Sequence, residues 1–261
     1  LRLDVLYGQN AHANGGIFGQ RAALQCLADD VPELAFELVT TSSYPSYGYM
    51  LAEGATTVWE TYTGQSGDQM NAKSQPMNAY VYEYLEDLSG IVLPTPATPR
   101  PLDGPTDPCG GAWAGEGAPP AYDVAVRPRL VGDLEHGESS VQLGAGRGVE
   151  VAARWWTQRF DPSAGSSGAA AAERVRVAVR VPPGATAAVC VPLLQFMDPA
   201  QVTLAEGACG ALWAAGAPTE AAAYCTGLQR AWAITPEAYL SGTLALLLGA
   251  GEWDFTLSGQ A

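Results

Sequence analysis

The chain has 261 residues, 48% of them hydrophobic and 15% charged, a balance typical of globular chains that bury a core. Its 13 basic and 27 acidic residues give a formal charge of −14, which repels phosphate backbones and anionic lipid surfaces. We therefore expect neither a nucleic-acid nor a membrane partner. The longest apolar runs, such as Leu244 to Ala250, are too short to span a bilayer.

The start of the chain carries no signal-peptide pattern. It opens at Leu1, within sequence that is typical of a folded segment, so we expect a fragment or a processed product. The compartment stays open.

Residues 1–91 have a helical period. Apolar residues recur at helical spacing over Gly19 to Asp30 and over Pro32 to Val39, where proline suits a first helical turn. A third helix is predicted from about Pro76 to Leu88, and Gly90 should end it.

A segment rich in Ser, Tyr and Gly, Thr40 to Tyr49, follows the second predicted helix, and Glu53 to Glu60 come next. Aromatic and small polar residues crowd there without a period. Such a loop on a helical scaffold is a usual place for binding and catalytic residues. The alternative is a surface connection with incidental aromatics.

Residues 92–120 hold eight prolines and several glycines, which predicts a linker or long loop. Beyond it the period changes to two, most plainly where Val175, Val177, Val179 and Val181 alternate with mostly basic residues. Short strands between Gly and Pro turns predict an antiparallel β-sandwich over residues 121–261. The low-complexity tract Ser163 to Ala172 is expected to be an excursion between two strands.

The five cysteines have no CxxC spacing, which argues against a zinc site and against a complete disulfide framework. We expect buried apolar thiols. The alternative is that Cys209 and Cys225 pair in an oxidising compartment.

Four stretches of the first part resemble the α-L-rhamnosidases of glycoside hydrolase family 78: HANGGIFG (12–19), YPSYGYM (44–50), GATTVWE (54–60) and LSGI (88–91). Further stretches resemble the family's C-terminal sandwich: VRPR (126–129), VGD (131–133), VPPGAT (181–186) and LGAG (248–251) with Phe255.

The resemblance implies an α+β multidomain chain. Residues 1–91 would be the C-terminal portion of an (α/α)6 glycosidase barrel, 92–120 a linker, and 121–261 the C-terminal sandwich. Because that toroid needs about a dozen helices, residues 1–91 supply only its last few.

The resemblance also implies inverting hydrolysis of terminal α-L-rhamnosides. This chemistry needs a carboxylic acid to protonate the leaving oxygen and a carboxylate to activate water. Glu60 matches the family's general base, with Trp59 as apolar wall against the sugar. His12 matches a histidine that contacts a sugar hydroxyl, and Tyr47 and Tyr49 are candidate stacking surfaces. The alternatives are a helix-start or surface carboxylate for Glu60 and core packing for the others.

Two departures bear on activity. The family's general acid comes from an earlier barrel segment, and where the family shows an Asn-His pair this chain has Ser74 or Gln75. Three hypotheses follow: a rhamnosidase fragment that lacks its acid, a non-catalytic carbohydrate-binding or structural remnant, and another (α/α)6 glycosidase or lyase.

We expect no cofactor and no metal, because Asp123, Asp133 and Glu135 lack the spacing of a calcium cage. The expected partner is a rhamnose-containing glycan or glycoside. An incomplete barrel would also leave apolar helix faces exposed, which predicts self-association.

Overall fold

The computed structural model describes residues 10, 12, 16–59, 80–92, 122–143, 149–158, 174–192, 203–207, 209–214, 217–234 and 243–258. Two compact units make up the chain: Leu1–Glu86 with Val131–Asp133, and Asp87–Leu130 with Leu134–Ala261. The predicted division at a linker over 92–120 stays a prediction, since nearly all of that stretch lies outside the described residues. The tract Ser163–Ala172 also lies outside them.

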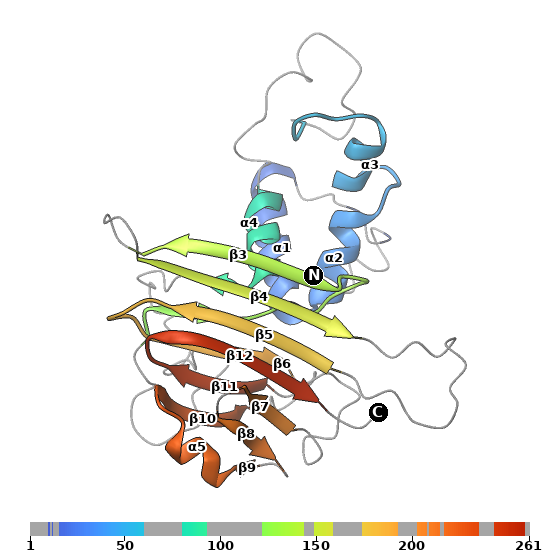
Figure 1. The fold of residues 1–261 in the computed structure, drawn as a ribbon. Helices are drawn as coiled ribbons and strands as arrows, with labels where there is room; N and C mark the ends of the chain where they lie inside the picture. Colours follow the sequence, from blue (N-terminus) through green and yellow to red (C-terminus); the bar gives the residue numbers. More distant parts are fainter. Residues whose placement is uncertain are drawn as a thin grey trace, which may run out of the picture. The chain divides into compact units, whose positions relative to one another are not determined.

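The first unit is helical (Figure 1). Its helices are α1 (Gly16–Asp30), α2 (Pro32–Thr40), α3 (Tyr47–Ala52) and the start of α4 (Tyr80–Ser89). The turn at Val31, whose N–H donates to the Leu27 carbonyl at 2.7 Å, joins α1 to α2 as a helical hairpin. The apolar positions of the predicted period, among them Leu27, Leu34 and Leu38, are buried. The first two predicted helices are therefore confirmed, as is the third over its described part.

No helix in the described ranges is both long and apolar enough to cross a bilayer.

A short segment from much later in the chain completes the first unit. Val131 is buried, and the Gly132 N–H donates to the Glu33 carboxylate at 2.7 Å. Gly132 has φ +56°, and a Cβ there would overlap the Phe36 ring at 2.0 Å. Glycine is required on both grounds, because only glycine adopts this conformation cheaply and only glycine leaves room for the ring.

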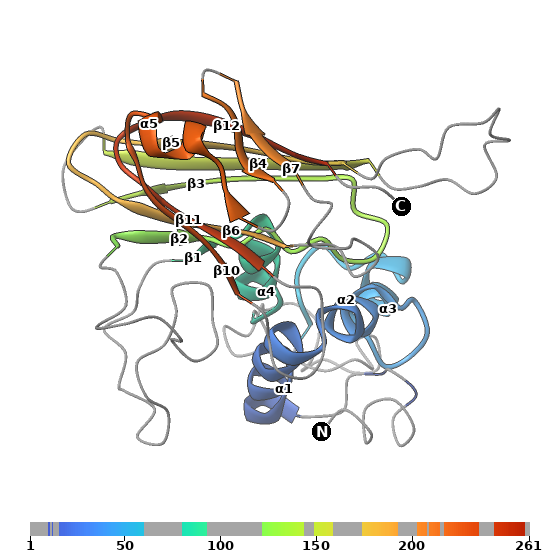
Figure 2. The same cartoon turned by 90° about the horizontal axis from the view of Figure 1, so that it is seen from below.

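The second unit is a two-layered β-sandwich (Figure 2). One five-stranded sheet has the order β1-β2-β6-β11-β10: β1 (Ile91–Val92), β2 (Val124–Val126), β6 (Ala187–Pro192), β11 (Thr243–Leu248) and β10 (Leu228–Ile234). The seven-stranded sheet has the order β3-β4-β5-β12-β7-β8-β9: β3 (His136–Gln142), β4 (Glu150–Gln158), β5 (Arg174–Val181), β12 (Gly251–Ser258), β7 (Thr203–Glu206), β8 (Gly210–Ala214) and β9 (Ala217–Pro218). Helix α5 (Glu220–Tyr224) lies between β9 and β10 in the sequence.

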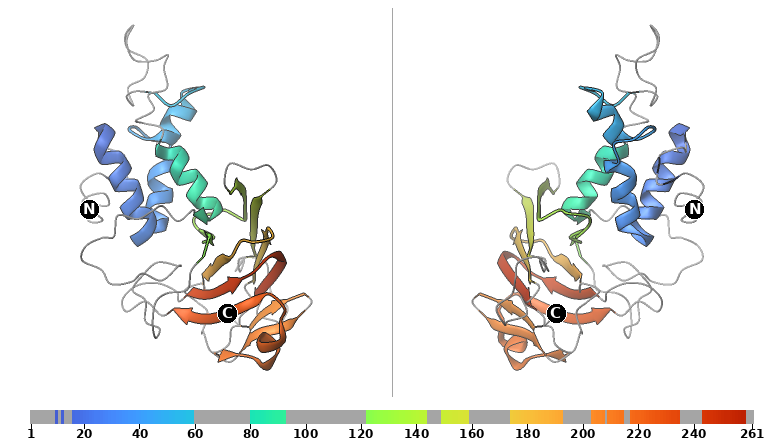
Figure 3. Two further views of the ribbon diagram at one scale, coloured as in Figure 1. Left: turned by 90° about the vertical axis from the view of Figure 1, so that its left-hand side faces the viewer. Right: turned by 90° about the vertical axis from the view of Figure 1, so that its right-hand side faces the viewer.

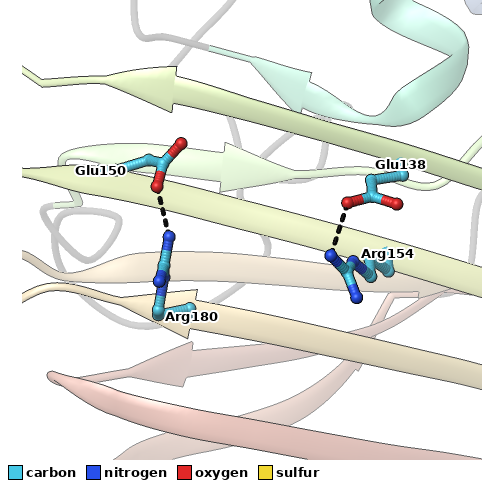
Figure 4. A network of polar contacts seen from close by, with 4 residues as sticks. All are labelled: Glu138, Glu150, Arg154 and Arg180. Carbon is cyan, nitrogen blue, oxygen red and sulfur yellow. Dashed lines mark hydrogen bonds and ion pairs between the residues drawn. The ribbon is translucent and has the colours of Figure 1, made fainter.

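The seven-stranded sheet is antiparallel throughout and confirms the predicted period of two. In β5 the four valines are buried, whereas Arg174, Arg176 and Arg180 are exposed. Ion pairs bridge neighbouring strands on the exposed face: Arg154 pairs with Glu138 at 2.7 Å, and Arg180 pairs with Glu150 (Figure 4). One face of this sheet is therefore core and the other polar.

The five-stranded sheet differs from the prediction in two ways. All described side chains of β2, β6 and β11 are buried, so these strands show no alternation. Strand β2 also pairs with β6 in parallel, which corrects the expectation of a purely antiparallel sandwich. The chain leaves β2 and returns to β6 only after β3, β4 and β5, and such a long connection permits parallel pairing.

The layers of the sandwich, seen edge-on in Figure 3, meet in one hydrophobic core. Its largest fully buried side chain is Trp155, whose indole N–H donates to the Leu88 carbonyl at 3.3 Å. Gly90, with φ +99°, ends α4 as predicted, and its carbonyl accepts the Arg127 N–H at 2.6 Å. This turn leads the chain from α4 into β1.

The expectation of buried apolar thiols is wrong. Cys209 and Cys225 form a disulfide with an S–S distance of 2.05 Å, and Cys190 is also disulfide-bonded. Cys26 keeps its thiol, but it is exposed on α1. The alternative, that Cys209 and Cys225 pair, is confirmed. The preferred expectation failed because a disulfide joins residues that the fold brings together, here across 16 positions.

Candidate functional site

The segment that was predicted to be an irregular loop contains α3. Ser46 caps this helix: its hydroxyl oxygen accepts the Tyr49 N–H at 2.9 Å, and the hydroxyl donates to the Thr41 carbonyl. Ser46 is completely buried, so both of its hydrogen bonds replace lost water contacts. The serine at this position is the local signal that predicts a helix start, whereas the aromatic and glycine content around it masks the signal.

Gly48 lets α3 lie close to the end of α2. A Cβ at this position would come within 2.3 Å of the Thr41 carbonyl oxygen and 2.6 Å of the Thr40 carbonyl oxygen. Any larger residue would push the two segments apart. The Tyr-Gly-Tyr sequence therefore places a small residue on the packed side of the helix and tyrosines beside it.

The tyrosines of this segment have different environments. Tyr47 is 6% exposed and packs into the unit's core, whereas Tyr49 is half-buried. Tyr44 is exposed, and its ring meets the Tyr49 ring edge-to-face at 5.4 Å. Tyr44 and Tyr49 thus form an aromatic pair with accessible surface, which suits an amphipathic ligand better than Tyr47 does.

His12 is half-buried and joins the N-terminal stretch to the segment before α3. Its Nδ1 lies 2.6 Å from the Asn10 carbonyl oxygen, and its Nε2 lies 2.8 Å from Ser43 Oγ. A carbonyl oxygen only accepts, so Nδ1 carries the proton. In the neutral ring Nε2 then accepts from the Ser43 hydroxyl. A sugar hydroxyl that binds His12 would share Nε2 with the Ser43 hydroxyl or replace it. The sequence analysis did not identify Ser43 as a site residue.

Trp59 is 7% exposed. It immediately precedes Glu60, which lies outside the described residues, as do Ser74 and Gln75. Burial holds Trp59 in place because its large apolar ring is costly to expose. Burial of Trp59 and Tyr47 agrees with core packing, so their sugar-contacting role stays a prediction, as does the role of Glu60.

Glu53 follows α3 and is exposed, where it ends the helix together with Gly54 at φ +83°. This placement agrees with a surface charge. Among the calcium candidates, the Asp123 carboxylate accepts the Thr186 N–H at 2.8 Å, which gives that residue a structural role in a turn.

Comparisons with known proteins identify what the first unit resembles. Residues 3–87 match the model of the bacterial α-L-rhamnosidase six-hairpin glycosidase domain. This range contains His12, Tyr47, Tyr49, Trp59 and Glu60. No curated protein matches the chain.

Solved structures resemble nearly the whole chain. The α-L-rhamnosidase from Dictyoglumus thermophilum is 18% identical, with a TM-score of 0.67 over 99% of this chain and 22% of that chain. The Streptomyces avermitilis α-L-rhamnosidase, solved with L-rhamnose, is 21% identical, with a TM-score of 0.56 over 97% of this chain and 19% of that chain. The suspected resemblance to α-L-rhamnosidases is thus confirmed, and the chain spans about a fifth of each enzyme.

Proposed function

We propose that this chain is the C-terminal portion of an α-L-rhamnosidase-like glycoside hydrolase that cleaves terminal α-L-rhamnosides with inversion. The observation that carries the proposal is the match of residues 3–87 to the six-hairpin glycosidase model, because the whole candidate site falls inside it. Helices α1 to α4 would then be the last hairpins of an (α/α)6 barrel. The likeness to two α-L-rhamnosidases over nearly the whole chain supports the same architecture.

Glu60 is the proposed general base. An inverting enzyme places this carboxylate on one face of the sugar, where it removes a proton from the attacking water, while a carboxylic acid on the other face protonates the leaving oxygen. Two such groups stand roughly 6.5 to 9.5 Å apart, so they come from different walls of a pocket. The acid would come from a part of the barrel that residues 1–91 do not supply.

The accessible residues near α3 would bind the sugar. The paired rings of Tyr44 and Tyr49 offer a face for the C–H groups of a pyranose, and the Ser43 hydroxyl with His12 offers hydrogen bonds to its hydroxyls. Gly48 and the Ser46 cap would hold these groups in place, since both fix α3 against α2.

The second candidate function is a non-catalytic carbohydrate-binding or structural role. It is favoured by the coverage, because the chain spans only 22% and 19% of the two enzymes it resembles. In this case the site near α3 binds a sugar without an acid to cleave it.

The test is turnover of 4-nitrophenyl α-L-rhamnopyranoside, with the chain and with any longer polypeptide that carries it. Glu60→Gln should lower kcat by roughly 10² to 10⁴-fold, because the base is lost and the shape is kept. Glu53→Gln is the matched control, since it removes a nearby exposed carboxylate and should leave kcat within about twofold. Proton NMR of the first product should show the β anomer.

Turnover that Glu60→Gln leaves unchanged would remove this residue from the mechanism. Absence of turnover together with saturable binding of L-rhamnose that Tyr49→Ala weakens would support the second function. Retention of the α anomer would contradict inversion.

A further inference from the structure

The sandwich carries a concavity of about 560 Å³ that the proposed active site does not use. It is built where the end of β7, the end of α5 and the start of β12 come together. The volume lies within the roughly 300 to 1,000 Å³ of typical ligand pockets.

One wall of this concavity is held by covalent and main-chain contacts. The Cys209–Cys225 disulfide ties the β7–β8 turn to the residue that follows α5. The Cys209 N–H donates to the Glu206 carboxylate at 2.8 Å, and Glu206 is only 8% exposed. A carboxylate that lines a cavity in a fixed orientation presents acceptor sites for hydroxyl and amide donors.

Trp253 also lines the concavity. Its indole N–H donates to the Gly249 carbonyl at 3.2 Å, and its ring stacks on Phe255 at 5.9 Å. A Cβ at Gly227 would come within 2.8 Å of the ring, so the adjacent turn fits tightly against it. Trp253 is therefore a rigid element that any occupant would meet without reorganising it.

The rim carries the most exposed aromatic ring among the described residues. Tyr224, the last residue of α5, is 85% exposed and lines the concavity. An aromatic ring with so little packing contributes little to folding, yet it offers a flat apolar face next to acceptors. Glu252, also exposed, lines the concavity from the start of β12.

The chemistry of these groups selects the ligand. Among the described residues, the lining includes Glu206 and Glu252 and no basic side chain, a charge balance that disfavours phosphates and carboxylates. A divalent cation alone would use the carboxylates but leave the aromatic surface without a role. A neutral pyranoside uses both, because its hydroxyls donate to carboxylates and its C–H face packs on a ring. An organic ammonium ion would also fit, and the choice of the sugar rests on the proposed function.

We propose that this concavity, lined by Glu206, Tyr224, Glu252 and Trp253, is a saccharide-binding site of the sandwich that takes a neutral pyranoside. The experiment titrates the Glu60→Gln chain with methyl α-L-rhamnopyranoside, methyl β-D-glucopyranoside, putrescine and calcium chloride. Protein NMR follows the Trp253 indole resonance. Trp253 belongs to the sandwich unit and reports binding there whether or not Glu60 is the catalytic base, so a failure of the catalytic proposal and a failure of this one give different results.

The expected result is saturable binding of a pyranoside in the millimolar range, typical of small sugars on shallow sites. Tyr224→Ala should weaken it roughly three- to tenfold, and Tyr224→Phe should retain most of it, because the ring face is the contact. Glu252→Gln should weaken it several-fold. The controls are Trp156→Ala, an exposed aromatic on β4, and Glu220→Gln, an exposed carboxylate on α5; both should leave the affinity unchanged.

Three results would overturn the proposal. The first is that neither pyranoside shifts the Trp253 resonance. The second is binding that Tyr224→Ala and Glu252→Gln leave intact while both variants keep the parent circular dichroism spectrum. The third is binding of putrescine or calcium alone with the same dependence on these residues.

Discussion

Gly137 on β3 lies opposite Trp155 on β4, and the glycine makes room for the indole. A Cβ at Gly137 would come within 2.4 Å of Trp155 Nε1, whose N–H donates to the Leu88 carbonyl. Gly137→Ala should therefore force the ring to move and lower the free energy of unfolding by about 1 to 3 kcal/mol. Denaturant unfolding measures this.

Gly207→Ala is the control for Gly137→Ala, because nothing lies within 4 Å of the Cβ it would add. Its effect should stay within about 0.5 kcal/mol. Equal effects of the two variants would show that the indole tolerates the methyl group.

Asp254 and Arg176 form a two-pronged ion pair on the exposed sheet face, where the Arg176 guanidinium also lies over the Trp156 ring at 5.2 Å. Hydrogen bonding to Arg176 holds the pKa of Asp254 below its ordinary value, and the same hydrogen bond raises the pKa of Arg176. A carboxyl whose folded pKa is lowered stabilises the fold above its unfolded pKa, about 3.9, and this contribution is lost as the pH falls through the folded pKa.

Asp254→Asn should accordingly destabilise the chain at pH 7, and the difference from the parent should shrink below about pH 4. Both groups are largely exposed, so the effect is small and falls with added salt. Thermal unfolding at several pH values measures it. In an Arg176→Gln background the same change should have little effect, and a difference that is constant with pH would contradict the assignment.

Single residues differ in how much the sequence says about them. Gly90 was predicted as a helix stop because glycine favours positive φ, and it serves as one. Ser43, Gly48 and Gly137 could not be predicted, because each acts on a partner that only the fold brings close. The placement of Tyr47 in the core and of Tyr49 at its edge likewise depends on which side of α3 faces the unit.

At the scale of elements, the spacing of apolar residues predicted the helices and strands that bury only one face. Helices α1 and α2 and strand β5 each bury one face, so their apolar spacing follows the geometry of the element. Strands β6 and β11 are buried on both faces and show no alternation, and α3 is too short to establish a period. These elements could not be predicted from spacing alone.

The Cys209–Cys225 disulfide closes a segment that contains β8, β9 and α5. The crosslink lowers the conformational entropy of the unfolded chain because it closes a loop of 16 residues. Replacing both cysteines by serine should therefore lower the free energy of unfolding by about 3 kcal/mol. Chemical unfolding under non-reducing conditions measures the loss. Cys26→Ser is the matched control, since this thiol is free and exposed, and its effect should stay within about 0.5 kcal/mol. A similar small loss in the double variant would mean that the segment is held by packing alone.

At the scale of the whole molecule, the two-layer sandwich was predicted, and the order of its strands was not. The β2–β6 pair joins segments about sixty residues apart, and no local pattern specifies which distant strand lies next to which. The same reason applies to the concavity on the sandwich, whose lining comes from three separate stretches of the chain.

Self-association remains the prediction for the chain by itself. Leu51 on α3 is 73% exposed and Leu85 on α4 is 48% exposed, although both are large and apolar. Analytical ultracentrifugation should show a mass that rises with protein concentration. Leu51→Lys with Leu85→Glu should shift the chain toward the monomer, whereas Trp156→Lys, at an exposed aromatic residue on β4, serves as the comparison outside these helices. A parent chain that is monomeric at all concentrations would contradict the prediction.

Residues Val131–Asp133 belong to the helical unit although they follow the proline-rich stretch in the sequence. They therefore determine where this polypeptide can be truncated. A piece that stops near residue 91 would lose the Gly132 N–H that donates to the Glu33 carboxylate and the close approach of this glycine to the Phe36 ring. Such a piece would expose an aromatic surface and leave a carboxylate without its donor. A truncated polypeptide that keeps the helical unit intact should therefore extend at least through Asp133.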